Sequence, residues 1–160
     1  MIVVPKKNWS VQRPLHLGAA VAGRHDELQD QLTAYGRPVG VAFQQRDDIL
    51  GAFGDSEVTG KPVGDDLREG KPTPLRATAR RLATPAQGEV LARAGDLEMS
   101  EDELTDLQDA MLATGAVDVI EAEIAQLTAE AMEALQRMNL AGGAGDALRD
   151  LAHFVAYRTH

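Results

Sequence analysis

Residues 26–53, DELQDQLTAYGRPVGVAFQQRDDILGAF, decide the fold of this chain. Apolar residues recur through this stretch at intervals of three and four, which is the period of one face of an α-helix. Asp26 and Glu27 stand at its start, where the helix dipole favours negative charge. The stretch therefore predicts a helix over 26–53, with a kink or a break at Pro38, which lacks a backbone donor.

The flanking segments extend the same pattern. Residues 15–22 predict a helix that ends near Gly23. Residues 54–74 contain four glycines and three prolines, which predict a loop, with a short helical turn at 65–69. This loop follows directly on the long helix.

Residues after the loop predict further helices. Thr84-Pro85 is a cap followed by a proline in the first helical turn, and Ser100 to Glu103 form a capping box. Residues 117–139 carry an apolar stripe at helical period, and a glycine-rich break at 142–145 precedes a last helix. The fold class is therefore all-α, and residues 1–160 are expected to form a single domain.

The composition excludes several classes of function. The 160 residues include no cysteine, so disulfides, thiolate metal sites and cysteine nucleophiles are absent. The net charge is −9, which is unfavourable for binding nucleic acid or anionic membranes. No apolar run is long enough for a membrane span or a signal peptide, so the expected location is cytoplasmic.

The end of the long helix carries a narrow polar face. Gln44, Asp47, Asp48 and Gly51 fall within an arc about 100° wide, while apolar residues occupy the opposite side. Mg²⁺ prefers carboxylate and phosphate oxygens and keeps several waters. Two adjacent aspartates can therefore hold Mg²⁺, which can in turn bind a diphosphate. The alternative interpretation is an ordinary solvated helix face.

Two lysines follow glycines in the loop. Lys61 and Lys71 supply mobile positive charges that suit phosphate oxygens. Neither belongs to a P-loop, because five residues rather than four separate the paired glycines and a proline follows each lysine. The alternative is that both are ordinary surface lysines.

Taken together, these segments resemble the polyprenyl synthetases, a family that includes geranylgeranyl and farnesyl diphosphate synthases. The resemblance rests on Gly40-x-x-Phe43-Gln44-x-x-Asp47-Asp48 and on Gly60-Lys61-Pro62-x-Gly64-x-Asp66-Leu67-x-x-Gly70-Lys71-x-Thr73. Shorter similarities occur at Arg13-Pro14, Gly18-Ala19 and Leu151-Ala152-x-Phe154-Val155. The resemblance covers most of this chain, but only the C-terminal half of such an enzyme.

The resemblance implies the C-terminal half of an isoprenoid-synthase-type helical bundle and a prenyltransferase activity. Asp47 and Asp48 would ligate Mg²⁺ bound to an allylic diphosphate, and Lys61 would complete the catalytic set. The reaction would be condensation of that substrate with isopentenyl diphosphate. The implied substrate-binding residues are Phe43, Gln44, Lys61 and Lys71.

Two departures from the family pattern bear on activity. Gly51 stands where many members have a third aspartate, one turn after Asp47, and the first aspartate-rich region of the family is not present. We therefore expect weak or absent synthase activity for this chain alone, even as a homodimer. The alternatives are a non-catalytic helical subunit that pairs with a fuller prenyltransferase, and an inactive truncated remnant.

Overall fold

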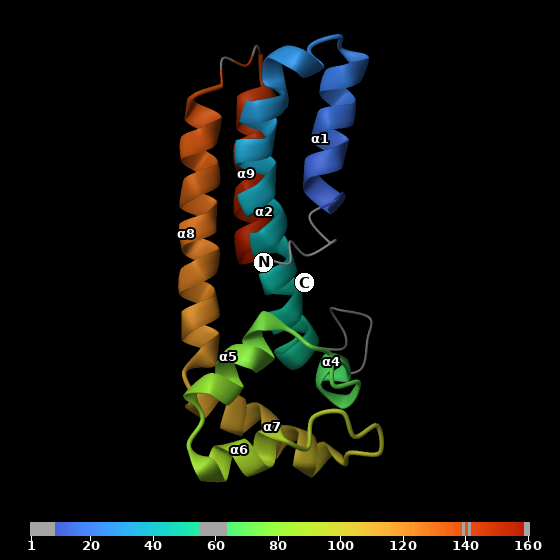
Figure 1. Cartoon of the computed structure of the whole chain (residues 1–160), viewed down its shortest axis with the longest axis vertical. Helices are drawn as coiled ribbons and strands as arrows, with labels where there is room; N and C mark the ends of the chain where they lie inside the picture. Colours follow the sequence, from blue (N-terminus) through green and yellow to red (C-terminus); the bar gives the residue numbers. More distant parts are fainter. Residues whose placement is uncertain (1–8, 55–63, 139, 141, 159–160) are drawn as a thin grey trace. The chain divides into compact units, whose positions relative to one another are not determined.

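The computed structural model describes residues 9–54, 64–138, 140 and 142–158 (Figure 1). Every regular element in these ranges is an α-helix, which confirms the predicted all-α class. The helices are α1 (Trp9–Val21), α2 (His25–Phe53), α4 (Asp65–Arg68), α5 (Pro74–Leu82), α6 (Pro85–Leu91), α7 (Glu101–Ala113), α8 (Ala116–Gln136) and α9 (Ala144–Tyr157).

The helices belong to two compact units. The first contains the chain up to Gln44 and the segment from Glu123 to Arg158, and the second contains the segment from Gln45 to Ala122. Helices α2 and α8 each contribute to both units. The single domain expected over 1–160 stays a prediction.

The first unit consists of long helices that run side by side (Figure 1). Tyr35 of α2 is fully buried, and its hydroxyl donates a hydrogen bond of 2.6 Å to the carbonyl of Leu148 in α9. Burial raises the pKa of Tyr35 to about 12. The buried core of this unit includes Leu32, Val39, Ile124, Ala131, Leu135, Ala152 and Val155.

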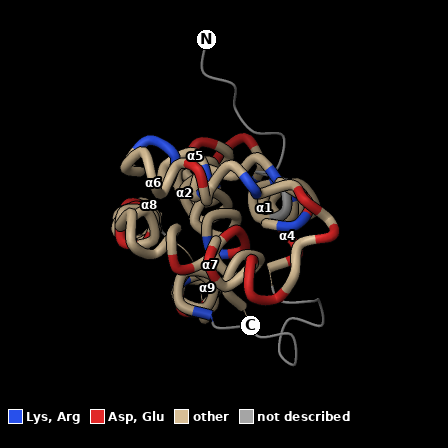
Figure 2. The backbone as a smooth tube through the Cα atoms, turned by 90° about the horizontal axis from the view of Figure 1, so that it is seen from below, with Lys and Arg blue, Asp and Glu red and all other residues tan. Residues whose placement is uncertain are grey.

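The second unit contains the last turns of α2, the short helices α4 to α7 and the first turns of α8. The guanidinium of Arg46 in α2 donates to both carboxylate oxygens of Glu121 in α8, at 2.7 and 2.6 Å. Helix α7 carries acidic charges only, which appear as red segments in Figure 2. The core of this unit includes Leu67, Leu75, Leu91, Leu104, Leu107, Met111 and Ile120.

The predicted helix ends agree well with the structure wherever a local cap specifies them. Ser100 accepts a hydrogen bond from the backbone of Glu103, and the Glu103 carboxylate accepts one from the backbone of Ser100, which completes the predicted capping box. Thr84 and Gln87 form a second capping box at α6. Gly23 has φ 68, the left-handed conformation that ends a helix, between α1 and α2.

Pro38 does not break the long helix, and a predicted break at this position is wrong. Helix α2 runs from His25 to Phe53 with Pro38 inside it. A proline in a helix interior costs about 3 kcal/mol. Tyr35, Val39 and Ala42 beside it are buried, and burial of this apolar face outweighs the cost of the proline.

Candidate functional site

The last turns of α2 position the two adjacent aspartates. Ile49 and Ala52 are buried on the apolar side of this part of the helix, which fixes its rotation. As a result Asp47 is half-buried, while the side chain of Asp48 is only 4% exposed. A buried carboxylate needs a compensating positive charge.

Lys71 supplies that charge. Its ammonium lies 3.4 Å from Oδ1 of Asp48 and donates a hydrogen bond to Oδ2 of Asp66 in α4. Burial by itself would lower the pKa of Lys71, but the hydrogen bond and charge of Asp66, together with the charge of Asp48, outweigh it and raise the pKa above its ordinary value. One ammonium thus joins the end of α2 to α4.

The absence of a side chain at Gly51 leaves the space that the Asp66 carboxylate fills. A Cβ added at Gly51 would lie 2.6 Å from Cγ of Asp66, which is closer than real Cβ atoms come to other groups. Gly51 stands one turn after Asp47 on α2. The carboxylate of Asp66 therefore occupies the space into which a side chain at position 51 would extend.

The backbone around α4 holds Asp66 and Lys71 in position. Gly64 has φ 69, the left-handed conformation, and forms the N-cap of α4. Gly70 has φ 66, and a Cβ added there would lie 2.7 Å from Cα of Gly95. The guanidinium of Arg76 donates to the carbonyls of Gly70 and Ala94. These contacts fix the loop immediately before Lys71.

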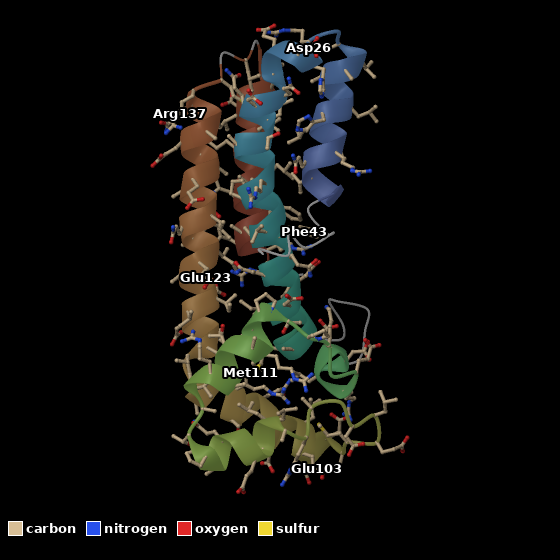
Figure 3. The ribbon with its side chains drawn as sticks, in the orientation of Figure 1. Asp26, Phe43, Glu103, Met111, Glu123 and Arg137 are labelled. Carbon is tan, nitrogen blue, oxygen red and sulfur yellow. The ribbon has the colours of Figure 1, made fainter. Side chains whose placement is uncertain are left out.

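The remaining predicted site residues lie in different places. Lys61 falls outside the described residues. Phe43 lies on α2 in the side-chain view (Figure 3), one turn before Asp47, and belongs to the first unit with Gln44. The Arg158 guanidinium lies 4.3 Å from the centroid of the Phe43 ring, a cation–π contact. Phe43 also lines an apolar cavity of about 260 Å³, together with Val11, Pro14, Leu15, Leu151, Phe154 and Val155.

The chemistry of the donor set is compatible with Mg²⁺. Across residues 9–54, 64–138, 140 and 142–158, no three carboxylate or imidazole groups gather in an arrangement that would hold a metal ion. Mg²⁺ does not require three, because it is commonly bound through one or two carboxylates, substrate phosphates and water. The Lys71 ammonium beside Asp48 also shows that this carboxylate accommodates a cation.

The sequence pattern does not single out two residues of this region. Asp66 appears in the sequence only as one position of the loop motif, and Arg46 belongs to no predicted site, although its guanidinium is paired with Glu121. The signal for Asp66 was Gly51, a glycine in a helix interior without a local reason for its presence. A glycine there weakens a helix, so its presence indicates a close neighbour.

Comparison with known proteins decides the family. The family model described as "Polyprenyl synthetase" matches residues 2–114. The chain belongs to the polyprenyl synthetase family. This confirms the resemblance seen in the sequence.

The curated relatives of this polyprenyl synthetase chain are isoprenyl diphosphate synthases. It is 34% identical over 150 residues to a (2E,6E)-farnesyl diphosphate synthase of Mycobacterium tuberculosis, covering 89% of this chain and 41% of that protein. It is 36% identical over 128 residues to a geranylfarnesyl diphosphate synthase of Aeropyrum pernix, covering 80% and 39%. The chain thus spans about two fifths of the length of these relatives.

Solved structures of the family share the fold. A geranylgeranyl pyrophosphate synthase from Corynebacterium glutamicum, complexed with isoprenyl diphosphate and magnesium, matches with a TM-score of 0.89 at 38% identity. The match covers 94% of this chain and 43% of that one. A polyprenyl synthase from Caulobacter crescentus CB15, complexed with calcium and isoprenyl diphosphate, matches with a TM-score of 0.83 at 31% identity.

One further observation concerns membranes. Within the described residues, no helix combines the length and the apolar character that crossing a bilayer would need.

Proposed function

We propose that this polyprenyl synthetase chain binds an allylic diphosphate through Mg²⁺, as one part of a prenyltransferase site. Asp47 and Asp48 would hold the metal ion, and Lys61 and Lys71 would bind the diphosphate. The observation that carries the proposal is the buried Asp48 carboxylate, which lies 3.4 Å from the Lys71 ammonium and so already faces a cation. The relatives named as diphosphate synthases support the same chemistry.

The proposed reaction is condensation with isopentenyl diphosphate. The C–O bond of the allylic diphosphate breaks with its electron pair on the departing diphosphate. The double bond of isopentenyl diphosphate then attacks the allylic cation, and a proton is lost. Bound Mg²⁺ would stabilise the negative charge on the departing diphosphate.

The charged residues of the chain would act electrostatically, by holding the metal ion and by neutralising the diphosphate. The carboxylates of Asp47 and Asp48 would fix the metal ion at the end of α2, and the mobile ammonium of Lys71 would neutralise diphosphate oxygens. Phe43 and Gln44, one turn earlier on α2, would contact the substrate with a ring and an amide.

Binding of geranyl diphosphate tests this proposal, measured by calorimetry with and without Mg²⁺. The wild-type chain should bind it only when Mg²⁺ is present. Asp47→Asn should weaken metal-dependent binding about tenfold or more, since it removes a charged ligand. Asp109→Asn, which neutralises an exposed acid on α7 in the same unit, is the matched control and should bind as the wild type does.

Two results would contradict the proposal. One is binding of geranyl diphosphate that does not depend on Mg²⁺. The other is equal binding by the Asp47→Asn and Asp109→Asn variants, because the aspartate pair would then have no special role.

A second candidate function is that of a helical subunit working with a fuller prenyltransferase. Two observations favour it: the chain spans about two fifths of the length of its relatives, and it exposes large apolar side chains on α1 and α9. These are Leu17, Val21, Phe154 and Tyr157, with exposed fractions of 66%, 84%, 55% and 58%. Such surfaces are typical of sites where another protein packs.

A further inference from the structure

We propose that Lys71 and Mg²⁺ compete for the aspartate pair. The Lys71 ammonium forms an ion pair with Asp48 when no metal ion is bound, and Mg²⁺ displaces this ammonium toward the diphosphate. The inference deepens the proposed function and rests on it. It gives Lys71 two successive positions, first on the carboxylates and then on the substrate.

The burial of Asp48 is the first reason. Its side chain is 4% exposed, and a carboxylate so far removed from water is costly without a positive charge beside it. The Lys71 ammonium lies 3.4 Å from Oδ1 of this group. In the metal-free chain Lys71 therefore serves as a counter-ion of Asp48.

Competition between cations is the second reason. Mg²⁺ and an ammonium that share one carboxylate would repel each other at short range. A divalent ion with its own carboxylate contacts has the stronger attraction, so the lysine is the group that leaves. Lysine suits this role, because its charge sits at the end of a flexible four-carbon stem.

The position of Lys71 in the chain is the third reason. It lies between α4 and α5, just after a loop that Arg76 fixes by two carbonyl contacts. Its side chain is 27% exposed, so one side of it faces solvent. The ammonium can therefore swing away from the carboxylates while the backbone stays where it is.

Amine labelling of the intact chain, quantified by mass spectrometry, tests the displacement directly. Lys71 should be protected in the metal-free chain, should label several-fold faster when Mg²⁺ is added, and should be protected again when inorganic diphosphate joins Mg²⁺. Unfolded chain gives the reference rate. An unchanged rate at Lys71, in a chain that calorimetry shows to bind Mg²⁺, would overturn the inference.

Metal affinity supplies a second, independent measurement. Lys71→Met should bind Mg²⁺ about tenfold more tightly than the wild type, since the competing cation is gone. Lys71→Arg retains a positive charge and should not show this gain. Arg81→Met removes an exposed charge of α5 in the same unit and should match the wild type. Equal affinity of the Lys71→Met variant and the wild type would overturn the inference.

The two proposals fail in different ways. Absence of Mg²⁺-dependent binding of geranyl diphosphate by both the wild type and Lys71→Met would remove the proposed function and the inference together. Mg²⁺-dependent binding of geranyl diphosphate, with labelling at Lys71 unchanged throughout, would leave the function in place and remove only the inference.

Discussion

At the residue scale, the contacts of the aspartate pair depend on a glycine. Gly51 lies one turn beyond Asp47, and the Asp66 carboxylate fills the space beside it. Lys71 then joins that carboxylate to Asp48. Residues from the end of α2, from α4 and from the segment after α4 thus meet at one small site.

Gly51→Ala should lower the free energy of unfolding by about 1–3 kcal/mol, because the new Cβ must push Asp66 away from Lys71. Urea unfolding measures this loss. Gly88→Ala is the matched control: Gly88 lies in helix α6 with nothing near an added Cβ, so alanine should be neutral or stabilising by up to about 1 kcal/mol.

A double-mutant cycle isolates the Gly51–Asp66 contact. In an Asp66→Ala background the cost of Gly51→Ala should largely disappear, since the obstructing carboxylate is gone. An equal cost in both backgrounds would show that the contact does not determine stability.

At the element scale, the Tyr35 hydrogen bond ties α2 to α9. At about pH 8, Tyr35→Phe should lower the free energy of unfolding by about 1 kcal/mol. This is the usual net contribution of one such hydrogen bond. Tyr157→Phe, which alters an exposed tyrosine of α9, should leave stability unchanged. Urea unfolding of the three proteins makes the comparison.

The same tyrosine predicts a pH dependence. Burial raises the pKa of Tyr35 to about 12 in the folded chain, against about 10 in the unfolded chain. Because the folded state holds the proton more tightly, the stabilisation is complete below about pH 10 and is lost as the pH rises through about 12. The advantage of the wild type over Tyr35→Phe should therefore shrink above about pH 10. A constant difference across this range would contradict the assignment.

Sequence alone predicts those elements whose limits are set locally. The Ser100 and Thr84 caps, the turn at Gly23 and the short helix α4 all depend on neighbouring residues, and the structure contains each of them. The effect of Pro38 could not be predicted locally. The helix continues through this proline because the helix face around it is buried against other parts of the fold. The α-helical class followed from periodicity, which packing does not alter.

The contacts within the candidate site could not be predicted from the sequence, because they depend on tertiary packing. The sequence indicated Asp47, Asp48 and Lys71 by type and spacing, but the ion pairs of Lys71 depend on how α4 packs against the end of α2. Asp66 lies fifteen residues after Gly51 in the chain, so no helical period relates the two. Only tertiary structure shows that they touch.

At the scale of the whole molecule, the chain spans about two fifths of the length of its relatives. The 160-residue chain, incubated with Mg²⁺, geranyl diphosphate and isopentenyl diphosphate, should therefore give little or no elongated product, because it carries one aspartate-rich region. Product analysis by chromatography measures this, with a full-length synthase as the positive control. Efficient elongation by the purified chain would contradict the expectation.

Using the chain to capture its partners from native extract tests the hypothesis that it is a subunit of a larger prenyltransferase. A chain that works with a fuller prenyltransferase should retain that enzyme in stoichiometric amount, and the pair should elongate where the chain alone does not. Retention of no prenyltransferase would remove this second candidate.

The contact between Gly51 and Asp66 also limits how this sequence can evolve. Any side chain introduced at position 51 would meet the Asp66 carboxylate. A side chain at position 51 could be accommodated only if the Asp66 side chain moved, and that movement would disturb its hydrogen bond with Lys71. The placement of the Asp66 side chain therefore limits which residues position 51 of this chain can tolerate.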